Sequence, residues 1–111
     1  MATVEFTRAA DRDLIDIYLH GVTCFGPVQA ERYLAMLNDK AEIAALHPDF
    51  GADYGFVRPG LRRYEAASHA LYYRTTRSGI LVLRVGWMRG GIWGDELECK
   101  EKLALRLTSK G

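Results

Sequence analysis

After one short strand, the first half of the chain repeats apolar positions at the spacing of helices. Thr3–Phe6 is predicted to be that strand. Thr7 is the expected N-cap of the helix that follows, because a threonine hydroxyl can accept a hydrogen bond from a free backbone amide of the first turn. The apolar stripe of this helix recurs at helical spacing, at Ala10, Leu14, Ile17 and Tyr18.

A second helix is predicted to begin at Pro27, since proline is well tolerated at the first helical position. It should end at His47, because the residue before Pro48 avoids helical geometry. Its apolar stripe is Ala30, Leu34, Leu37, Ala41 and Ala44. Gly21–Phe25 interrupts the pattern of the first helix, so we expect a loop over Gly21–Gly26. The small alanines on both stripes would let the two helices approach closely as an antiparallel hairpin.

Short strands are predicted for the middle of the chain. Residues 48–60 hold two prolines and three glycines, so a loop is expected there. Residues 61–86 are rich in tyrosine, leucine and β-branched side chains, which predicts three consecutive antiparallel strands with a hairpin turn at Thr76–Gly79. A stretch rich in glycine and tryptophan, residues 86–94, leads into a possible C-terminal helix from Asp95 to Leu107.

These elements predict an α+β fold in a single domain, residues 1–111. The domain should hold an N-terminal strand, an antiparallel helical hairpin packed on a small antiparallel sheet, and a possible C-terminal helix. Residues 86–111 form an atypical tail within it. The other face of the sheet should be open and flanked by arginines.

The charges are distributed unevenly, although the net charge is only +1. Residues 1–56 carry four basic and nine acidic side chains, a net of −5, whereas residues 57–89 carry seven arginines and one glutamate, a net of +6. Residues 90–111 carry four of each sign. Either the arginines form a surface that binds a partner, or they pair with the acidic helices and the field cancels. The sequence favours neither.

Several classes of function lack their sequence signals. No apolar run reaches the roughly 18 residues of a membrane span, and the N-terminus resembles no secretory signal, so a cytoplasmic protein is expected. Cys24 and Cys99 fit no metal or redox spacing. We expect both as reduced thiols, with a disulfide as the alternative. The three histidines show no ligand spacing and no phosphate-binding glycine loop occurs, so neither a metal nor a cofactor is expected.

A set of motifs runs through the chain in a fixed order: Val4-Glu-Phe-Thr-Arg-Ala-Ala-Asp-Arg-Asp-Leu-Ile-Asp-Ile-Tyr18, Phe25-Gly-Pro-Val-Gln-Ala-Glu-Arg-Tyr33, Leu46-His-Pro48 with Gly51, Gly60-Leu-Arg-Arg63, His69-Ala-Leu-Tyr-Tyr-Arg74 and Ile80-Leu-Val-Leu-Arg-Val85. Together they resemble the RelE/ParE superfamily, the toxins of bacterial type II toxin–antitoxin systems, and the ParE branch most closely. The resemblance implies a strand, a helical hairpin and a three-stranded meander.

ParE-type members of this superfamily poison DNA gyrase by trapping it on cleaved DNA, whereas RelE-type members cut messenger RNA on the ribosome. An antitoxin neutralises both types. RelE-type nucleases carry basic residues where this chain has Ala70 and Met88, so the resemblance implies a ParE-like binding inhibitor with no catalytic residue. The stretch after Val85 also departs from ParE toxins, which commonly end that strand with a histidine and a short tail. The alternatives are a RelE-like ribosome-dependent mRNA endonuclease that uses other arginines, or a disarmed toxin that only binds its antitoxin.

The expected partners are a ParD-like antitoxin, with which the chain would form a hetero-oligomer, and DNA gyrase. No direct sequence-specific contact with nucleic acid is expected. The candidate target-binding residues are Arg62, Arg63, Arg74, Arg84, Trp87 and Arg89. The candidate antitoxin-binding residues are Leu14, Tyr18, Phe25, Tyr33 and Trp93. The competing interpretations are a solvated edge strand for Arg62 and Arg63, ion pairs with helix carboxylates for Arg74 and Arg84, and a structural role for His69.

Overall fold

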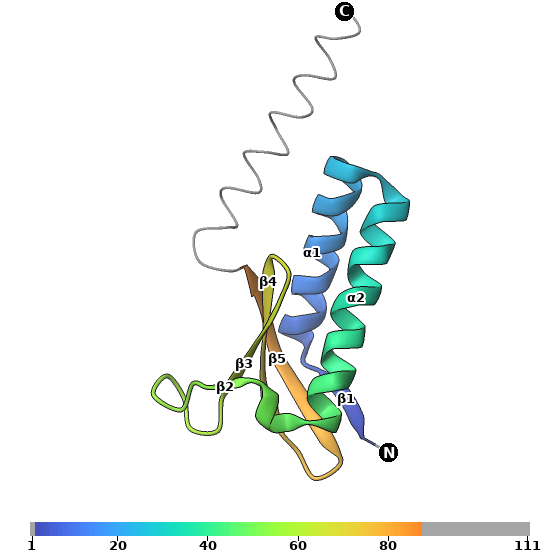
Figure 1. Ribbon diagram of the computed structural model, residues 1–111. Helices are drawn as coiled ribbons and strands as arrows, with labels where there is room; N and C mark the ends of the chain where they lie inside the picture. The colour runs from blue at the N-terminus through green and yellow to red at the C-terminus, as the bar shows by residue number, and fades with distance from the viewer. Residues whose placement is uncertain (1, 88–111) are drawn as a thin grey trace, which may run out of the picture.

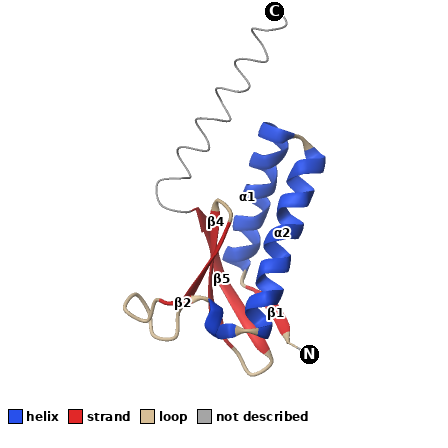
Figure 2. Cartoon of the chain, in the orientation of Figure 1, coloured by secondary structure: helices blue, strands red, loops and turns tan. Residues whose placement is uncertain are grey.

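Two helices cover one face of a five-stranded sheet in the computed structural model, which describes residues 2–87 (Figures 1 and 2). The elements follow the chain as β1 (Thr3–Phe6), α1 (Arg8–Phe25), α2 (Pro27–Leu46), the 3₁₀ turn η1 (Pro48–Phe50), β2 (Ala52–Asp53), β3 (Arg62–Ala66), β4 (His69–Thr75) and β5 (Gly79–Trp87). The predicted α+β fold, with a helical hairpin packed on a small sheet, is confirmed. The predicted C-terminal helix lies outside the described residues.

The sheet is mixed, with the strand order β1-β5-β4-β3-β2. The predicted meander is present, because β3, β4 and β5 pair antiparallel in succession. The first strand adds a parallel pairing to it, from Thr3 opposite Gly79 to Phe6 opposite Val82. Parallel neighbours need a long crossover, and here the helical hairpin lies in the connection between them. At the other edge, the short strand β2 forms within the stretch that was expected to be a loop.

The helix boundaries follow the capping signals at three of the four ends. Thr7 caps α1 by accepting a hydrogen bond from the Ala10 amide, and Pro27 opens α2. His47 is the C-cap of α2, as predicted. The loop predicted over Gly21–Gly26 is wrong, because α1 continues to Phe25 and only Gly26 breaks the helix.

Glycine serves two different purposes at this end of the hairpin. A Cβ on Gly21 would lie 3.2 Å from the Cβ of Ala30, so the glycine lets α2 pack closely against α1 without interrupting it. Gly26 has φ +87°, a conformation that side chains disfavour, and it provides the reversal between the helices. A one-residue connection therefore replaces the longer loop that the sequence suggested.

The hydrophobic core lies between the helical hairpin and the sheet. Its largest buried members come from both layers: Ile17, Leu37, Leu71, Tyr73, Ile80, Val82 and Val85, together with Ala10, Ala41 and Ala44. Alternation along β4 directs Leu71 and Tyr73 toward the helices, so Tyr72 and Arg74 face the opposite side. We call that side the outer face of the sheet.

Tyr73 joins the core to the connection between α2 and β3. Its side chain is fully buried, and its hydroxyl donates a hydrogen bond to the Pro48 carbonyl at 2.7 Å and accepts one from the Gly51 amide at 3.1 Å. Burial raises the pKa of the Tyr73 phenol above its ordinary value. The protonated hydroxyl therefore holds η1 against the sheet across the whole neutral range of pH.

The expectation of a reduced Cys24 is wrong in this structure. Cys24 is buried near the end of α1 and is disulfide-bonded. The only other cysteine of the sequence, Cys99, lies outside the described residues.

We predict that Tyr73→Phe lowers the free energy of unfolding by about 1–3 kcal/mol, because it leaves two buried backbone groups without their partner. The matched control is Tyr18→Phe, on a half-buried tyrosine for which residues 2–87 provide no hydroxyl hydrogen bond, and it should change stability by less than about 0.5 kcal/mol. Urea unfolding of both variants at pH 7 checks the difference, and equal stabilities would contradict the role of the Tyr73 hydroxyl.

The same tyrosine predicts a loss of stability in alkali. Its pKa is raised in the folded state, so its contribution is complete below the ordinary tyrosine value of 10.0 and declines as the pH rises through the higher folded value. The free energy of unfolding of the wild type should therefore fall as the pH rises above 10, and that of Tyr73→Phe should fall less steeply. If the stability of the wild type and that of the variant change with the same slope between pH 9 and 11, the role given to the Tyr73 hydroxyl is wrong.

Candidate functional site

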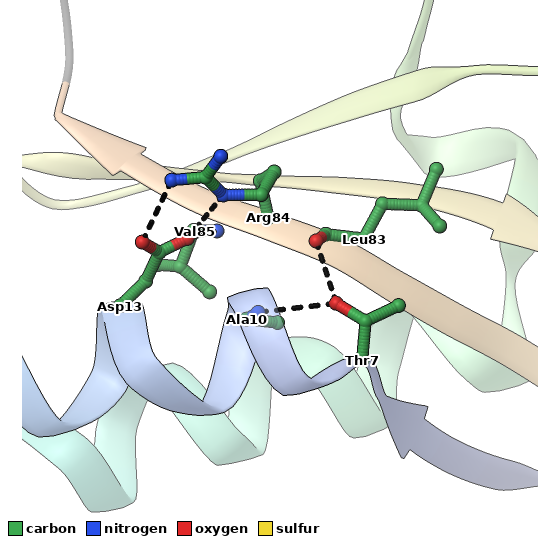
Figure 3. A network of polar contacts seen from close by, with 6 residues as sticks. All are labelled: Thr7, Ala10, Asp13, Leu83, Arg84 and Val85. Carbon is green, nitrogen blue, oxygen red and sulfur yellow. Dashed lines mark hydrogen bonds and ion pairs between the residues drawn. The ribbon is translucent and has the colours of Figure 1, made fainter.

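Side chains of α1 complete the hydrogen bonding of β5 where β1 ends (Figure 3). The Thr7 hydroxyl donates to the Leu83 carbonyl at 2.8 Å. Beyond it, the Asp13 carboxylate accepts from the Val85 amide at 2.9 Å and from the Arg84 guanidinium at 2.8 and 3.0 Å. Asp13 therefore acts as an edge cap for the sheet and as the partner of Arg84 at once.

This network decides between the two interpretations of Arg84. The hydrogen bond from Arg84 to Asp13 raises the pKa of the guanidinium, and the charge of the carboxylate adds to the effect. The arginine side chain is still 64% exposed, whereas that of Asp13 is only 15% exposed. Pairing with a helix carboxylate is thus correct for Arg84, and its solvent side remains available to a partner.

Arg63 lies at the centre of an aromatic cluster on the outer face. Its Nε donates to the Tyr72 hydroxyl at 3.2 Å, and its guanidinium lies 3.4 Å from Glu65. The guanidinium carbon is 5.6 Å from the centre of the Tyr54 ring and 5.9 Å from that of Tyr72, within the range of cation–π contacts. The hydrogen bond to Tyr72 raises the pKa of Arg63. With a side chain only 15% exposed, Arg63 supports this surface more than it presents a free charge.

The remaining predicted target-binding residues separate into three environments. Arg62 faces the helix side and donates to the Gly51 carbonyl at 2.7 Å, with Asp49 at 3.5 Å. Arg74 is exposed on the outer face, and within residues 2–87 it forms no ion pair. Trp87 is the last residue of β5, but its side chain and Arg89 lie outside the described part. The four predicted arginines that lie within residues 2–87 therefore do not converge on one point.

The predicted antitoxin-binding residues lie mostly along one flank of α1. Leu14 and Tyr18 are half-buried there, and Phe25 at the end of the helix is 52% exposed. Ile15 and Leu19, which were not among the predicted residues, are each 56% exposed on the same helix. Their signal was present as apolar residues outside the core stripe.

Tyr33, the fourth predicted antitoxin-binding residue, does not extend this flank. Tyr33, on α2, is half-buried instead and hydrogen-bonds through its hydroxyl to His69 Nδ1 and to the Ser68 amide. His69 itself is only 2% exposed. Trp93 lies outside the described residues, so its expected contact with the antitoxin stays a prediction.

The most exposed large hydrophobic side chain of residues 2–87, Phe56, lies in a loop between β2 and β3 for which no role was predicted from the sequence. Phe56 is 80% exposed and Val57 is 64% exposed. The Phe56 ring packs beside that of Tyr54, with the ring centres 4.9 Å apart. Two adjacent bulky apolar residues between turn glycines were the available signal, and we name residues 54–60 the aromatic loop.

Residues 2–87 contain no group of three or more histidine, cysteine, aspartate or glutamate side chains that could hold a metal ion. Within the same residues, neither helix has the length and apolar character needed to cross a bilayer. The surfaces that remain as candidates are the apolar flank of α1, the outer face of the sheet and the aromatic loop.

Comparison with known proteins identifies a family for this architecture. The sequence profile described as "ParE toxin of type II toxin-antitoxin system, parDE" matches residues 4–89. Toxin ParE1 of Mycobacterium tuberculosis (strain ATCC 25618 / H37Rv) is 38% identical over 78 residues, covering 69% of this chain and 80% of that protein. Toxin ParE1 of Caulobacter vibrioides (strain ATCC 19089 / CIP 103742 / CB 15) is 34% identical over 74 residues, covering 67% and 77%. A solved chain titled "Chromosomal ParDE TA system from P. aeruginosa" has the same fold, with a TM-score of 0.68 at 24% identity over 80% of this chain and 98% of its own.

We predict that Asp13→Ala costs about 1–3 kcal/mol of stability, because it removes the partner of the Val85 amide. Arg84→Ala should cost only about 0–1 kcal/mol, since the exposed pair is screened by solvent. Asp16→Ala is the control, because this exposed carboxylate of α1 makes no hydrogen bond or ion pair within residues 2–87. Chemical unfolding measures all three, and an Asp13→Ala cost no larger than that of Arg84→Ala would refute the edge-cap role.

Proposed function

This chain belongs to the ParE toxin family of type II toxin–antitoxin systems, and from that premise we propose that it inhibits DNA gyrase by trapping the cleaved-DNA complex until a ParD-like antitoxin binds it. The observation that carries the proposal is the family match over residues 4–89, which spans every described element from β1 to β5. A gyrase inhibitor acts where DNA is, so the proposed compartment is the cytoplasm.

The geometry supports a toxin that binds rather than one that catalyses. Cleavage of RNA at a 2′-hydroxyl needs a base, an acid and free positive charge close together. Arg63 and Arg84 are held by Tyr72 and Asp13 instead. The outward position of the central strand that carries an arginine in RelE-type nucleases is the buried Ala70.

The apolar flank of α1 supports the proposed antitoxin contact. Ile15, Leu19 and Phe25 present large hydrophobic surface at the outside of the hairpin, and Val28 at the start of α2 is 60% exposed. Contiguous exposed apolar surface on a small domain marks an interaction site. An amphipathic antitoxin helix would bury its apolar side on such a flank, and a hetero-oligomer follows from that mode of binding.

A gyrase cleavage assay tests the proposed activity. The purified chain is incubated with bacterial DNA gyrase, ATP and supercoiled plasmid, and linear DNA that is covalently linked to protein is measured on a gel. We expect linear DNA to accumulate with increasing chain and to disappear when the cognate ParD-like antitoxin is added.

Two controls distinguish the alternatives. If linear DNA does not form but messenger RNA is cut at codon boundaries in a translating extract, the chain is a ribosome-dependent endonuclease. If neither occurs and antitoxin still binds, the chain is a disarmed toxin. Either result contradicts gyrase inhibition without affecting membership of the family.

We predict that the double variant Ile15→Asp, Leu19→Asp weakens antitoxin binding by at least about 30-fold, equivalent to about 2 kcal/mol, because it places two charges in an apolar contact. The control is Val57→Asp, which introduces one carboxylate at another exposed apolar position away from the hairpin. Isothermal titration with the antitoxin measures both. Equal affinities for the two variants would place the antitoxin elsewhere.

A further inference from the structure

The aromatic loop holds two large apolar side chains in water at the side of the molecule remote from the helical hairpin (Figure 1). A single exposed hydrophobic residue is ordinary on a protein surface. Phe56 and Val57 are adjacent, however, and Phe56 is the most exposed large hydrophobic side chain within residues 2–87. Neither side chain belongs to the hydrophobic core, and Phe56 keeps most of its surface in water although its ring touches that of Tyr54.

Hydrogen bonds within the loop hold it in one shape. The Tyr54 amide donates to the Leu61 carbonyl at 2.8 Å and closes the base of the loop. Inside it, the Val57 amide donates to the Tyr54 carbonyl at 2.9 Å, and the Leu61 amide donates to the Arg58 carbonyl at 3.0 Å. Gly60 has φ +82°, which allows the chain to turn back into β3.

The sheet supports the loop from below. The Tyr54 ring contacts both the Arg63 guanidinium, 5.6 Å from its centre, and the Phe56 ring, whose centre is 4.9 Å away. The Tyr72 ring of β4 adds an edge contact to Tyr54, with the ring centres 6.3 Å apart. A partner would therefore meet a preorganised aromatic anchor and would not have to order it on binding.

Unpaired cations border this anchor. Arg58 within the loop and Arg74 beside Tyr72 on the outer face are exposed, and neither forms an ion pair within residues 2–87. An aromatic anchor with arginine at its rim is the composition typical of binding hot spots between proteins. The complementary surface is an apolar pocket with carboxylates at its edge.

We infer that Phe56 and Val57 insert into an apolar pocket of the target topoisomerase protein, with acidic residues of that pocket facing Arg58 and Arg74. This inference rests on the proposed function and names the surface through which it would be exerted. It assigns Arg63 to support of the loop, because its guanidinium is already engaged by Tyr72, Glu65 and the Tyr54 ring.

A protein pocket fits this surface better than DNA does. Base stacking needs flat rings, and Val57 at the tip of the loop has none. The charges do not decide between the two, because Arg63 is held by Glu65 and Tyr72, and the unpaired Arg58 and Arg74 could face carboxylates or phosphates alike. The antitoxin surface proposed on α1 lies on the other side of the sheet, so the two partners would not meet at the loop.

The test compares Phe56→Ala with Phe50→Ala, a control that removes another exposed phenylalanine, 59% exposed, from η1. Binding to purified DNA gyrase without DNA is measured by biolayer interferometry, and linear DNA is measured in the plasmid cleavage assay. We expect Phe56→Ala to raise both the Kd and the concentration for half-maximal cleavage by at least about tenfold. Phe50→Ala should change either value by less than about threefold.

A charge reversal and a folding control complete the design. Arg58→Glu should weaken gyrase binding by at least about tenfold. The affinity that remains should also depend less on salt concentration than that of the wild type. Thermal unfolding should leave all variants within a few degrees of the wild type, because the altered side chains are exposed. Val57→Ser provides a second loop variant should Phe56→Ala unfold.

The outcomes separate the inference from the proposed function. If the wild type traps gyrase and Phe56→Ala is equally potent, the loop is not the anchor, although the function stands. Binding of the chain to plasmid DNA in the absence of gyrase is measured by fluorescence anisotropy. If Phe56→Ala weakens this DNA binding as much as it lowers potency against gyrase, the loop contacts nucleic acid and the inferred protein pocket is wrong. If the wild type neither binds nor traps gyrase, the proposed function fails, and the inference fails with it.

Discussion

The long central strand β5 must have partners on both of its edges, and this requirement determines where the first helix lies. β5 spans Gly79–Trp87, but its neighbour β1 covers only the first part, up to Val82. Backbone groups beyond that point need other partners, because buried polar groups left unpaired are costly. The chain meets the need by turning directly from β1 into α1, so that Thr7 and Asp13 reach the Leu83 carbonyl and the Val85 amide.

The position of α1 in turn decides which surfaces remain for partners. Asp13 of α1 hydrogen-bonds to β5, and Ile17 packs in the core. The flank of α1 that carries Ile15 and Leu19 is therefore exposed to solvent. The same contacts hold both helices on one face of the sheet, which leaves the outer face and the aromatic loop on the other. The two surfaces that we propose for partners therefore follow from one hydrogen-bonding requirement at a strand edge.

The sequence predicted most local features correctly, because caps, prolines and alternation act over a few residues. The Thr7 cap, the start at Pro27 and the inward side of β4 needed no knowledge of the rest of the chain. Gly21 was misinterpreted as a helix end, since its role is to admit Ala30 of the neighbouring helix. Other features depend on residues about 70 positions apart, as in the pairing of β1 with β5 and of Asp13 with Arg84. No local pattern encodes such contacts, and the support of Tyr54 by Arg63 was missed for the same reason.

The uneven charge of the chain is resolved by pairing some arginines and leaving others free. Arg62, Arg63 and Arg84 each meet a carboxylate, and the partner of Arg84 comes from the acidic first half of the sequence. Pairing with a carboxylate thus applies to these three, whereas a partner-binding arginine surface stays a prediction. The exposed Arg58 and Arg74 lie on the side of the aromatic loop, whereas each helix of the hairpin carries three acidic and two basic side chains. A small domain can in this way present a basic, aromatic surface to one partner and an apolar, mildly acidic flank to another, so that specificity for each can arise from charge as well as shape.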